Sequence, residues 1–167
     1  RGGADVAGAE NIAIGSNAMD AMTAGANNLA IGHDAMSAAT TTQQSIAIGQ
    51  EALGGGNVDG DYNIGIGYQA GNAIAAGDSN TLIGANAGDA ITSGACNIAM
   101  GSNALGAATD NNDNVAIGTS ALAVSADDAD FNVAIGKLAM GGSDVSGADN
   151  IAIGENTADA LLSLIHI

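Results

Sequence analysis

The chain repeats one short hydrophobic pattern: two large aliphatic residues separated by a small residue and followed by glycine. The first three copies occupy Asn11–Gly15, Asn28–Gly32 and Ser45–Gly49. Successive closing glycines are 17 or 18 residues apart, and nine copies cover most of the 167 residues. Self-similarity at a fixed period is the signature of an architecture built from equivalent units. The closing glycines are Gly15, Gly32, Gly49, Gly67, Gly84, Gly101, Gly118, Gly136 and Gly154.

Within each copy the hydrophobicity alternates with a period of two. Large residues stand one and three positions before the glycine, as Ile12 and Ile14 do before Gly15, and the residue between them is Ala or Gly in every copy except at Leu82. This alternation is typical of a short β-strand with one buried face, and glycine ends it too soon for a helix. We expect the aliphatic residues to point into the core and the small residues to form a flat outer face.

Short equivalent strands separated by variable turns predict an all-β fold, a parallel β-solenoid of nine coils. The one-residue differences in length fall in the variable half of each coil, where surface turns tolerate insertions. Nine coils stacked ~4.8 Å apart would give a rod about 43 Å long. We expect residues 1–158 to form this repeat domain. Residues 159–167 are dense in large aliphatic residues and form an atypical tail, either a cap or the false end of a truncated gene model.

Other fixed positions in the repeat have structural explanations. The closing glycine is expected at a corner that needs positive φ or a close backbone approach. Asparagine stands four residues before it in eight of nine coils, where stacked amides can hydrogen-bond along the rod and satisfy the turn backbone. Alanine stands three residues after it in eight coils, where a thin interior admits only a methyl group, and Met or Leu follows in six of them.

The motif Asn-Val/Ile-Ala-Ile-Gly-x-x-Ala, repeated nine times over residues 11–158, resembles the head repeats of trimeric autotransporter adhesins, the YadA-like heads. Related repeats also occur in phage tail fibres. The resemblance implies a left-handed parallel β-roll and a homotrimer on the cell surface. The coils here are a few residues longer than is usual in that family. A flat row of small residues would let identical copies approach closely, so we independently expect self-association.

Composition excludes several classes of function. Two Lys+Arg against 18 Asp+Glu give a net charge of −16, which excludes the cationic surface that nucleic acids need. No apolar run approaches the ~20 residues of a membrane span. The single Cys96 supplies neither a disulfide framework nor a metal cluster, and we expect it to be a small buried or semi-exposed filler. No catalytic residues and no organic cofactor are predicted, and His33, just after a corner glycine, is expected to be exposed.

Two acidic turns are candidates for binding calcium. Both have the alternating pattern Asp-x-Asp-x-Asn, in which oxygen donors suit a hard cation. The alternative is a solvated acidic turn that keeps the rod soluble. Tyr62, Tyr68 and Phe131 are the only aromatic residues; we expect them to pack over turns, with contact to a sugar as the alternative. The candidate metal ligands are Asp59, Asp61, Asn63, Asp128, Asp130 and Asn132.

Repetition without a predicted pocket favours a structural and adhesive role. The prediction is a segment of an extracellular surface fibre, a stalk or head that presents turn residues to a receptor or surface. A phage tail-fibre shaft is the nearest variant. Ice binding is the alternative from another class, because a flat row of small residues could order water. An enzyme is not expected, since acid–base chemistry needs titratable groups that converge in a pocket.

Overall fold

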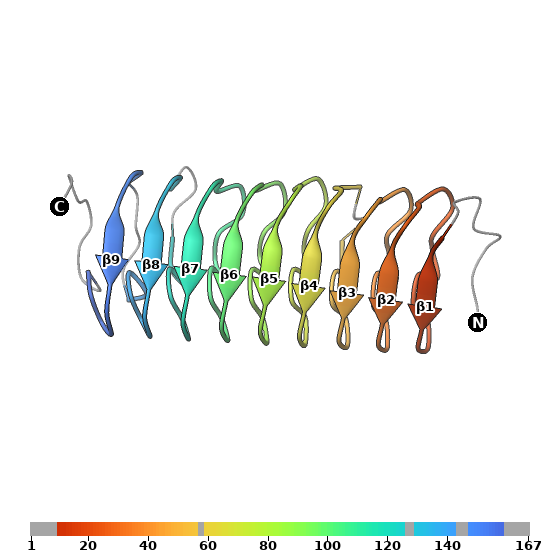
Figure 1. Ribbon diagram of the computed structural model, residues 1–167, viewed down its shortest axis with the longest axis horizontal. Coiled ribbons are helices and arrows are strands. Elements are labelled where there is room, and N and C mark those ends of the chain that lie inside the picture. The colour runs from red at the N-terminus through yellow and green to blue at the C-terminus, as the bar shows by residue number, and fades with distance from the viewer. Residues whose placement is uncertain (1–9, 57–58, 126–128, 143–146, 159–167) are drawn as a thin grey trace.

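A computed structural model describes residues 10–56, 59–125, 129–142 and 147–158. It has one parallel sheet whose nine strands lie in the order of the chain, and the rest of each coil is built from turns (Figure 1). The chain winds through about eight turns, which confirms the all-β solenoid. The strands, each of three residues, are β1 (Ile12–Ile14), β2 (Leu29–Ile31), β3 (Ile46–Ile48), β4 (Ile64–Ile66), β5 (Thr81–Ile83), β6 (Ile98–Met100), β7 (Val115–Ile117), β8 (Val133–Ile135) and β9 (Ile151–Ile153).

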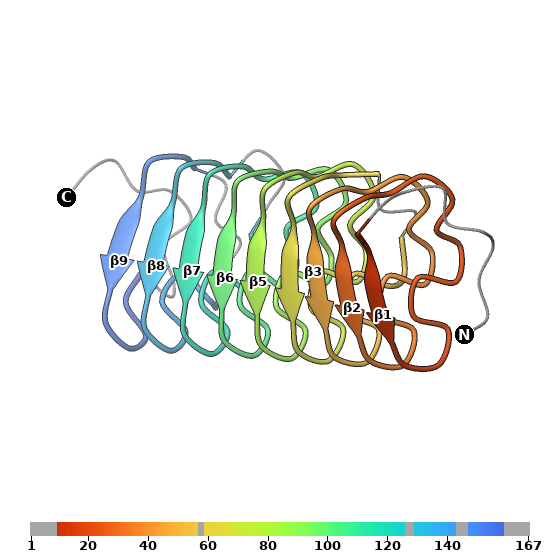
Figure 2. The same cartoon turned by 45° about the vertical axis from the view of Figure 1, so that its right-hand side comes forward.

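Equivalent residues of successive coils lie beside one another. The middle residues of β1, β2 and β3 pair as Ala13 with Ala30 and Ala30 with Ala47, and the same register continues to β9. The strands form one long face of the molecule, and the turns close each coil behind it (Figure 2). The turns carry coil-to-coil ladders of their own: the backbone N–H of Met36 donates to the carbonyl of Ala52, and that of Leu53 to the carbonyl of Ala70.

The direction in which the strand side chains point is the reverse of what the sequence pattern suggested. Ala30 in β2 and Ala47 in β3 are fully buried, while the aliphatic residues on either side of them are partly exposed. The middle residue is buried in every strand from β2 to β9. In the terminal strands Ile14 is 58% exposed and Ile153 is 65% exposed. The expectation that the aliphatic rows point into the core is therefore wrong.

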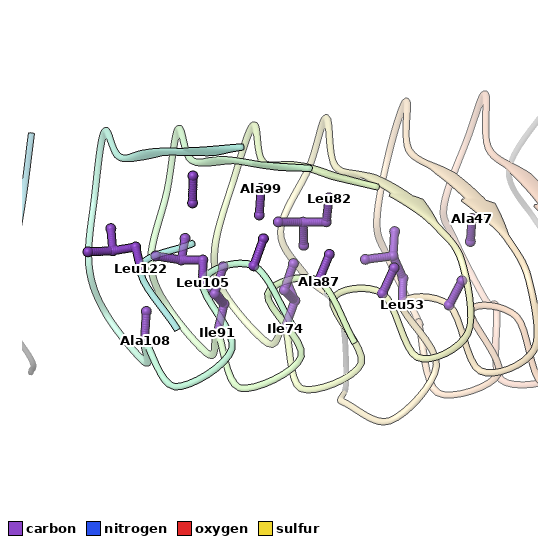
Figure 3. Packing of buried hydrophobic residues seen from close by; sticks show 14 of the residues in the cluster. Ala47, Leu53, Ile74, Leu82, Ala87, Ile91, Ala99, Leu105, Ala108 and Leu122 are labelled. Atoms are coloured by element: carbon purple, nitrogen blue, oxygen red, sulfur yellow. The ribbon is translucent and has the colours of Figure 1, made fainter. Parts of the chain in front are cut away.

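The narrow interior explains this reversal. The alanines three residues after the corner glycines are fully buried from Ala35 to Ala139, as predicted, while Ala18 in the first coil is partly buried. Leu53, Leu105 and Leu122 fill the space between this row and the strands (Figure 3). A Cβ added to Gly65, in the middle of β4, would lie 2.9 Å from Cγ of Leu53, closer than real contacts of that kind. An interior that barely admits a methyl group from the strand has no room for two β-branched side chains per coil.

The one large residue in the middle row, Leu82, is accommodated by two glycines. Gly71 and Gly88 stand where most other coils have Met or Leu. A Cβ at Gly71 would lie 2.6 Å from Cδ1 of Leu82, and one at Gly88 would lie 2.7 Å from Cδ2 of the same residue. The Leu82 side chain therefore fills the volume that the two missing side chains leave, and the packing of the interior is kept constant.

The corner glycines have the backbone conformation expected of them. Their φ angles lie between 129° and 142°, a region that other residues rarely adopt. The corners are also crowded: a Cβ on Gly101 would lie 2.5 Å from the carbonyl oxygen of Gly118 in the next coil. The φ angle favours glycine at this point of all nine coils, and the close approach of the next coil adds a second constraint from Gly15 to Gly136.

Candidate interaction surface

The outward side of the sheet forms a continuous apolar surface, here called the aliphatic face. It has two rows, contributed by the first and third residue of each strand, and none of its 18 positions is charged. Thr81 is the only member that is neither aliphatic nor methionine. The first row is Ile12, Leu29, Ile46, Ile64, Thr81, Ile98, Val115, Val133 and Ile151; the second is Ile14, Ile31, Ile48, Ile66, Ile83, Met100, Ile117, Ile135 and Ile153.

Two rows of exposed residues border the aliphatic face, one just before the strands and one just after them. All 18 of these residues are exposed. The leading row, two positions before each strand, is Glu10, Asn27, Gln44, Tyr62, Ser79, Cys96, Asp113, Phe131 and Asp149. The trailing row, two positions after each strand, is Ser16, His33, Gln50, Tyr68, Ala85, Ser102, Thr119, Lys137 and Glu155.

The bordering rows contain several residues that the sequence singled out. Tyr62, Tyr68 and Phe131 are 53%, 47% and 54% exposed, so half of each aromatic side chain faces solvent instead of being covered by packing over a turn. Cys96 is exposed, which contradicts its expected role as a buried or semi-exposed filler. His33 is exposed as predicted, and its Nδ1 lies 2.9 Å from a carboxylate oxygen of Asp34.

Between the leading row and the strands, buried amides form a continuous ladder along the rod. The backbone N–H of Asn28 donates to Oδ1 of Asn11 at 2.9 Å, and the same bond recurs between each pair of successive coils as far as Asn150 and Asn132. Where Ser45 replaces asparagine, its Oγ accepts the N–H of Asn63 instead, at 3.0 Å. This confirms that stacked amides satisfy the turn backbone, as the spacing of the asparagines predicted.

The candidate calcium ligands bind protein groups in this structure. Asp59 accepts hydrogen bonds from the hydroxyls of Thr40 and Thr41, and Oδ1 of Asp61 accepts the backbone N–H of Gln43 at 2.8 Å.

Oδ1 of Asp130 accepts the backbone N–H of Asn112 at 2.7 Å. Asn63 and Asn132 are fully buried members of the amide ladder, and Asp128 lies outside the described residues. No group of three or more His, Cys, Asp or Glu side chains that could hold an ion occurs within the described ranges. The arrangement joins neighbouring coils through backbone amides, and calcium binding at either turn stays a prediction.

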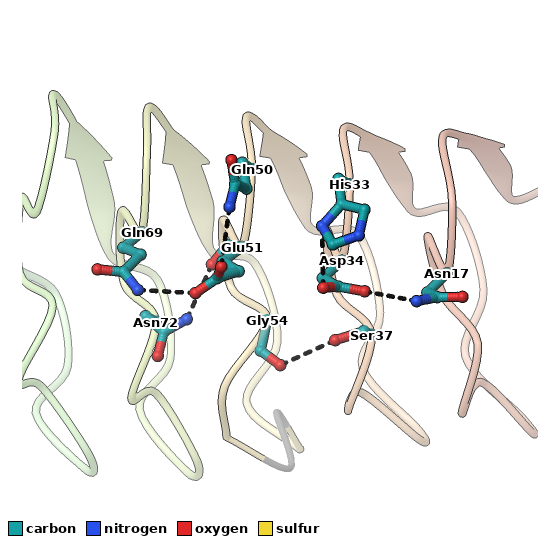
Figure 4. A network of polar contacts seen from close by, with 9 residues as sticks. All are labelled: Asn17, His33, Asp34, Ser37, Gln50, Glu51, Gly54, Gln69 and Asn72. Atoms are coloured by element: carbon teal, nitrogen blue, oxygen red, sulfur yellow. Dashed lines mark hydrogen bonds and ion pairs between the residues drawn. The ribbon is translucent and has the colours of Figure 1, made fainter.

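A second set of polar contacts follows the strands on the other side (Figure 4). Asn17 donates to Oδ1 of Asp34, and Gln69 donates to Oε2 of Glu51 at 2.7 Å, in each case between adjacent coils. The amides of Gln69 and Gln50 favour the carboxylate and lower the pKa of Glu51. Burial has the opposite effect on Asp89, where desolvation of the carboxylate raises the pKa.

Comparison with known proteins found no matching family model, curated protein or solved structure. Among the residues that the structure describes, none lies in a helix long and apolar enough to cross a bilayer. The aliphatic face is the feature that the sequence pattern located but placed on the wrong side of the sheet.

Proposed function

We propose that this chain is a structural and adhesive segment of an extracellular surface fibre, whose copies associate as a homotrimer through the aliphatic face. The observation that carries the proposal is that two rows of uncharged, almost entirely aliphatic side chains run along the outward side of the sheet, exposed in β1, β6 and β9 and partly exposed in the other strands. Contiguous apolar patches of more than a few hundred Å² on a soluble protein mark sites of interaction. The proposed role includes no enzymatic activity and no cofactor.

The aliphatic face and its bordering rows together have the area of one standard protein–protein interface. At ~4.8 Å per coil and ~3.3 Å per residue, the strands and their bordering rows cover about 43 Å by about 20 Å, or roughly 860 Å². A standard protein–protein interface buries about 800 Å² on each partner. The composition agrees with this use, because charged residues are depleted at the centre of interfaces and tolerated at the rim. Here the central rows have no charge, and the acids lie in the bordering rows and the turns.

The repeat motif supports the number of copies and the location. The resemblance of the Asn-Ile-Ala-Ile-Gly units to adhesin head repeats favours three copies, left-handed winding and a place on the cell surface. The turns behind the sheet would then face outward and meet a receptor or matrix. A phage tail-fibre shaft is the same architecture in another setting, and it remains the nearest variant of this proposal.

The basis for ice binding does not survive in the structure. That alternative, like the sequence argument for a close approach of identical copies, relied on a flat outer row of small residues, and this row is buried in β2 to β9. The outward rows are aliphatic and bulky, so no observation now favours ice over a protein partner.

The proposal is tested by the mass of the protein in solution. Three chains of 15.9 kDa give about 48 kDa in sedimentation or light scattering at micromolar concentration. Ile66→Lys places a charge in the centre of the aliphatic face and should shift the mass toward one chain. The matched control is Ala76→Lys, at an exposed position outside the face and its bordering rows, which should leave the assembly intact. A wild-type mass of one chain with intact β-structure would contradict the proposal.

A further inference from the structure

One hydrogen bond of the amide ladder depends on the length of the coil. Where successive corner glycines are 17 residues apart, Nδ2 of the ladder asparagine donates to a backbone carbonyl 14 residues later, in the next coil, at 2.7–2.9 Å. These bonds run from Asn11 to Gly25, Asn28 to Thr42, Asn63 to Gly77, Asn80 to Gly94 and Asn97 to Asn111. Where the glycines are 18 residues apart, between β3 and β4, β7 and β8, and β8 and β9, the described residues make no equivalent bond.

The first of these three long coils compensates for the missing bond. Ser45 replaces the ladder asparagine there, so the coil has no amide N–H to satisfy, and its Oγ accepts the backbone N–H of Asn63 at 3.0 Å. The carbonyl of Gly60, which stands where the shorter coils receive the asparagine, accepts the hydroxyl of Thr42 at 2.6 Å. The polar groups on both sides of this junction are therefore paired.

The last two long coils have no such compensation. Nδ2 of Asn114 turns back to the carbonyl of Asn112 at 3.1 Å and to Oδ1 of Asn97 at 3.3 Å, and within the described ranges it makes no bond to the following coil. Asn132 is fully buried, and its Nδ2 has no partner among the residues that the structure describes. A buried donor without a partner is unfavourable, because folding removes it from water without replacing that hydrogen bond. The junctions on either side of β8 therefore lack a contact that joins the earlier coils.

The interior is also more polar at the junction of β7 and β8. Seven residues after the corner glycine, the earlier coils have fully buried side chains such as Met22, Ile74 and Ile91, whereas Ser125 stands there after β7. Nδ2 of Asn111 donates to Oγ of Ser125 at 3.0 Å, and Oδ1 of the same asparagine is buried without a partner in the described part of the chain. This junction is stabilised less by apolar burial than one filled by Met or Ile, and a second polar atom in it is unpaired.

We infer that the rod has a release point after β7: the part of the chain that carries β8 and β9 opens while β1 to β7 remain folded. In a solenoid each coil contacts only its neighbours, so local opening occurs at the weakest junctions. Here two weak junctions adjoin each other near one end of the described rod (Figure 1). In a fibre under tension, unfolding of residues 119–158 would lengthen the fibre by about 130 Å, a consequence that rests on the proposed function. The release point itself depends only on contacts within one chain.

Native-state hydrogen exchange of the intact chain tests the release point. The protected amides of β8 and β9 should exchange roughly 5 to 100 times faster than those of β3 to β7, the factor that one unpaired buried donor produces. The other end of the sheet is the internal control, because β1 and β2 retain both ladder bonds and simple fraying would affect both ends alike. Equal rates at the two ends, or no step in rate after β7, would overturn the inference.

Two matched serine variants identify the cause. Oδ1 of Asn80 and Oδ1 of Asn132 each accept the backbone N–H of the next ladder asparagine at 3.0 Å, but among the described residues only Nδ2 of Asn80 has a partner. Asn80→Ser should therefore accelerate exchange in β5 and β6 by roughly fivefold or more. Asn132→Ser removes an unpaired donor and keeps an acceptor, so it should not accelerate exchange in β8 and β9. Equal acceleration by the two variants would show that the unpaired amide does not weaken its junction, and the release point would be wrong.

Discussion

At the scale of single residues, each coil depends on backbone conformations that most residues avoid. Besides the corner glycine, three residues per coil have φ between 48° and 65°: those two and four positions after the glycine and five positions before it. This left-handed conformation is unfavourable by roughly 1–2 kcal/mol for a residue with a side chain, and the free-energy cost is lowest for asparagine and aspartate. Asn17, Asp34 and Asn86 follow that preference, while Ser120 and Leu138 occupy the same position without it.

Replacing one of these residues with glycine should therefore stabilise the protein. For Ser120→Gly, relief of the left-handed strain outweighs the entropy that glycine adds to the unfolded chain, and we expect a gain of about 0.5–1 kcal/mol. Ser93→Gly is the matched control, because Ser93 is exposed and its φ is not positive. There the same change should be neutral or destabilising. Denaturant midpoints measure both, and equal shifts for the two variants would refute the assignment of strain.

The corner glycines and ladder asparagines could be predicted from the sequence because their spacing is nearly invariant. The direction of the strand side chains could not be predicted in that way. An alternation with a period of two shows that the two faces of a strand differ, but it does not show which face is inside. The direction is indicated by Leu82, the one large residue of the middle row. Glycines stand at positions 71 and 88, where most other coils have Met or Leu, so the interior loses two large side chains where the middle row gains one. Such compensation is expected only among residues that share one interior.

At the scale of the coil, the amide ladder joins each unit to the next. Oδ1 of Asn97 accepts the backbone N–H of Asn114 at 3.0 Å, and its Nδ2 donates to the carbonyl of Asn111 at 2.7 Å. Other hydrogen bonds run in the opposite direction along the rod. For example, the backbone N–H of Asp61 donates to Oδ1 of Asp78 in the following coil. Each turn is thus held from both sides, which explains how coils with only three residues of strand remain in register.

Replacement of one asparagine of the amide ladder should lower the free energy of unfolding. Asn97→Ala leaves a buried N–H and a buried carbonyl without partners, and each such group costs about 1–3 kcal/mol, so we expect a loss of roughly 2–6 kcal/mol. Asn97→Ser should lose clearly less, because the hydroxyl of Ser45 accepts the corresponding N–H elsewhere in the ladder. Chemical denaturation compares the two. An equal loss of stability in both variants would show that the ladder asparagines do not act by accepting the backbone N–H of the next coil.

The acidic turns contribute to the contacts between coils at the same scale. The pattern Asp-x-Asp-x-Asn predicts alternating oxygen ligands, and calcium binding there stays a prediction; the described members of both turns also make cross-coil contacts that the pattern does not predict. Asn63 is a fully buried ladder residue, and Asp61 accepts a backbone N–H. In a solenoid, an oxygen that repeats along the chain faces an equivalent backbone amide in the adjacent coil. Spacing within one turn does not contain that information.

At the scale of the whole molecule, the fold separates two kinds of surface. The sheet presents large apolar side chains without a charge, and the remaining sides carry most of a net charge of −16. Burial of the sheet between copies would leave the acids in solvent, where they keep an assembled rod soluble. Such an assembly would be a shaft with an apolar centre and a polar exterior, which fits the proposed role in a fibre.

The most direct test is the labelling rate of thiols placed in neighbouring rows of β7. In a Cys96→Ser background, Ala116→Cys and Ile117→Cys put a thiol in the inward and outward rows respectively. The inward thiol should be protected at every protein concentration, and the outward one should be protected when concentrated and become reactive on dilution, as copies separate. A reactive thiol at position 116 together with concentration-independent protection at position 117 would contradict both the direction in which the strand side chains point and the proposed assembly.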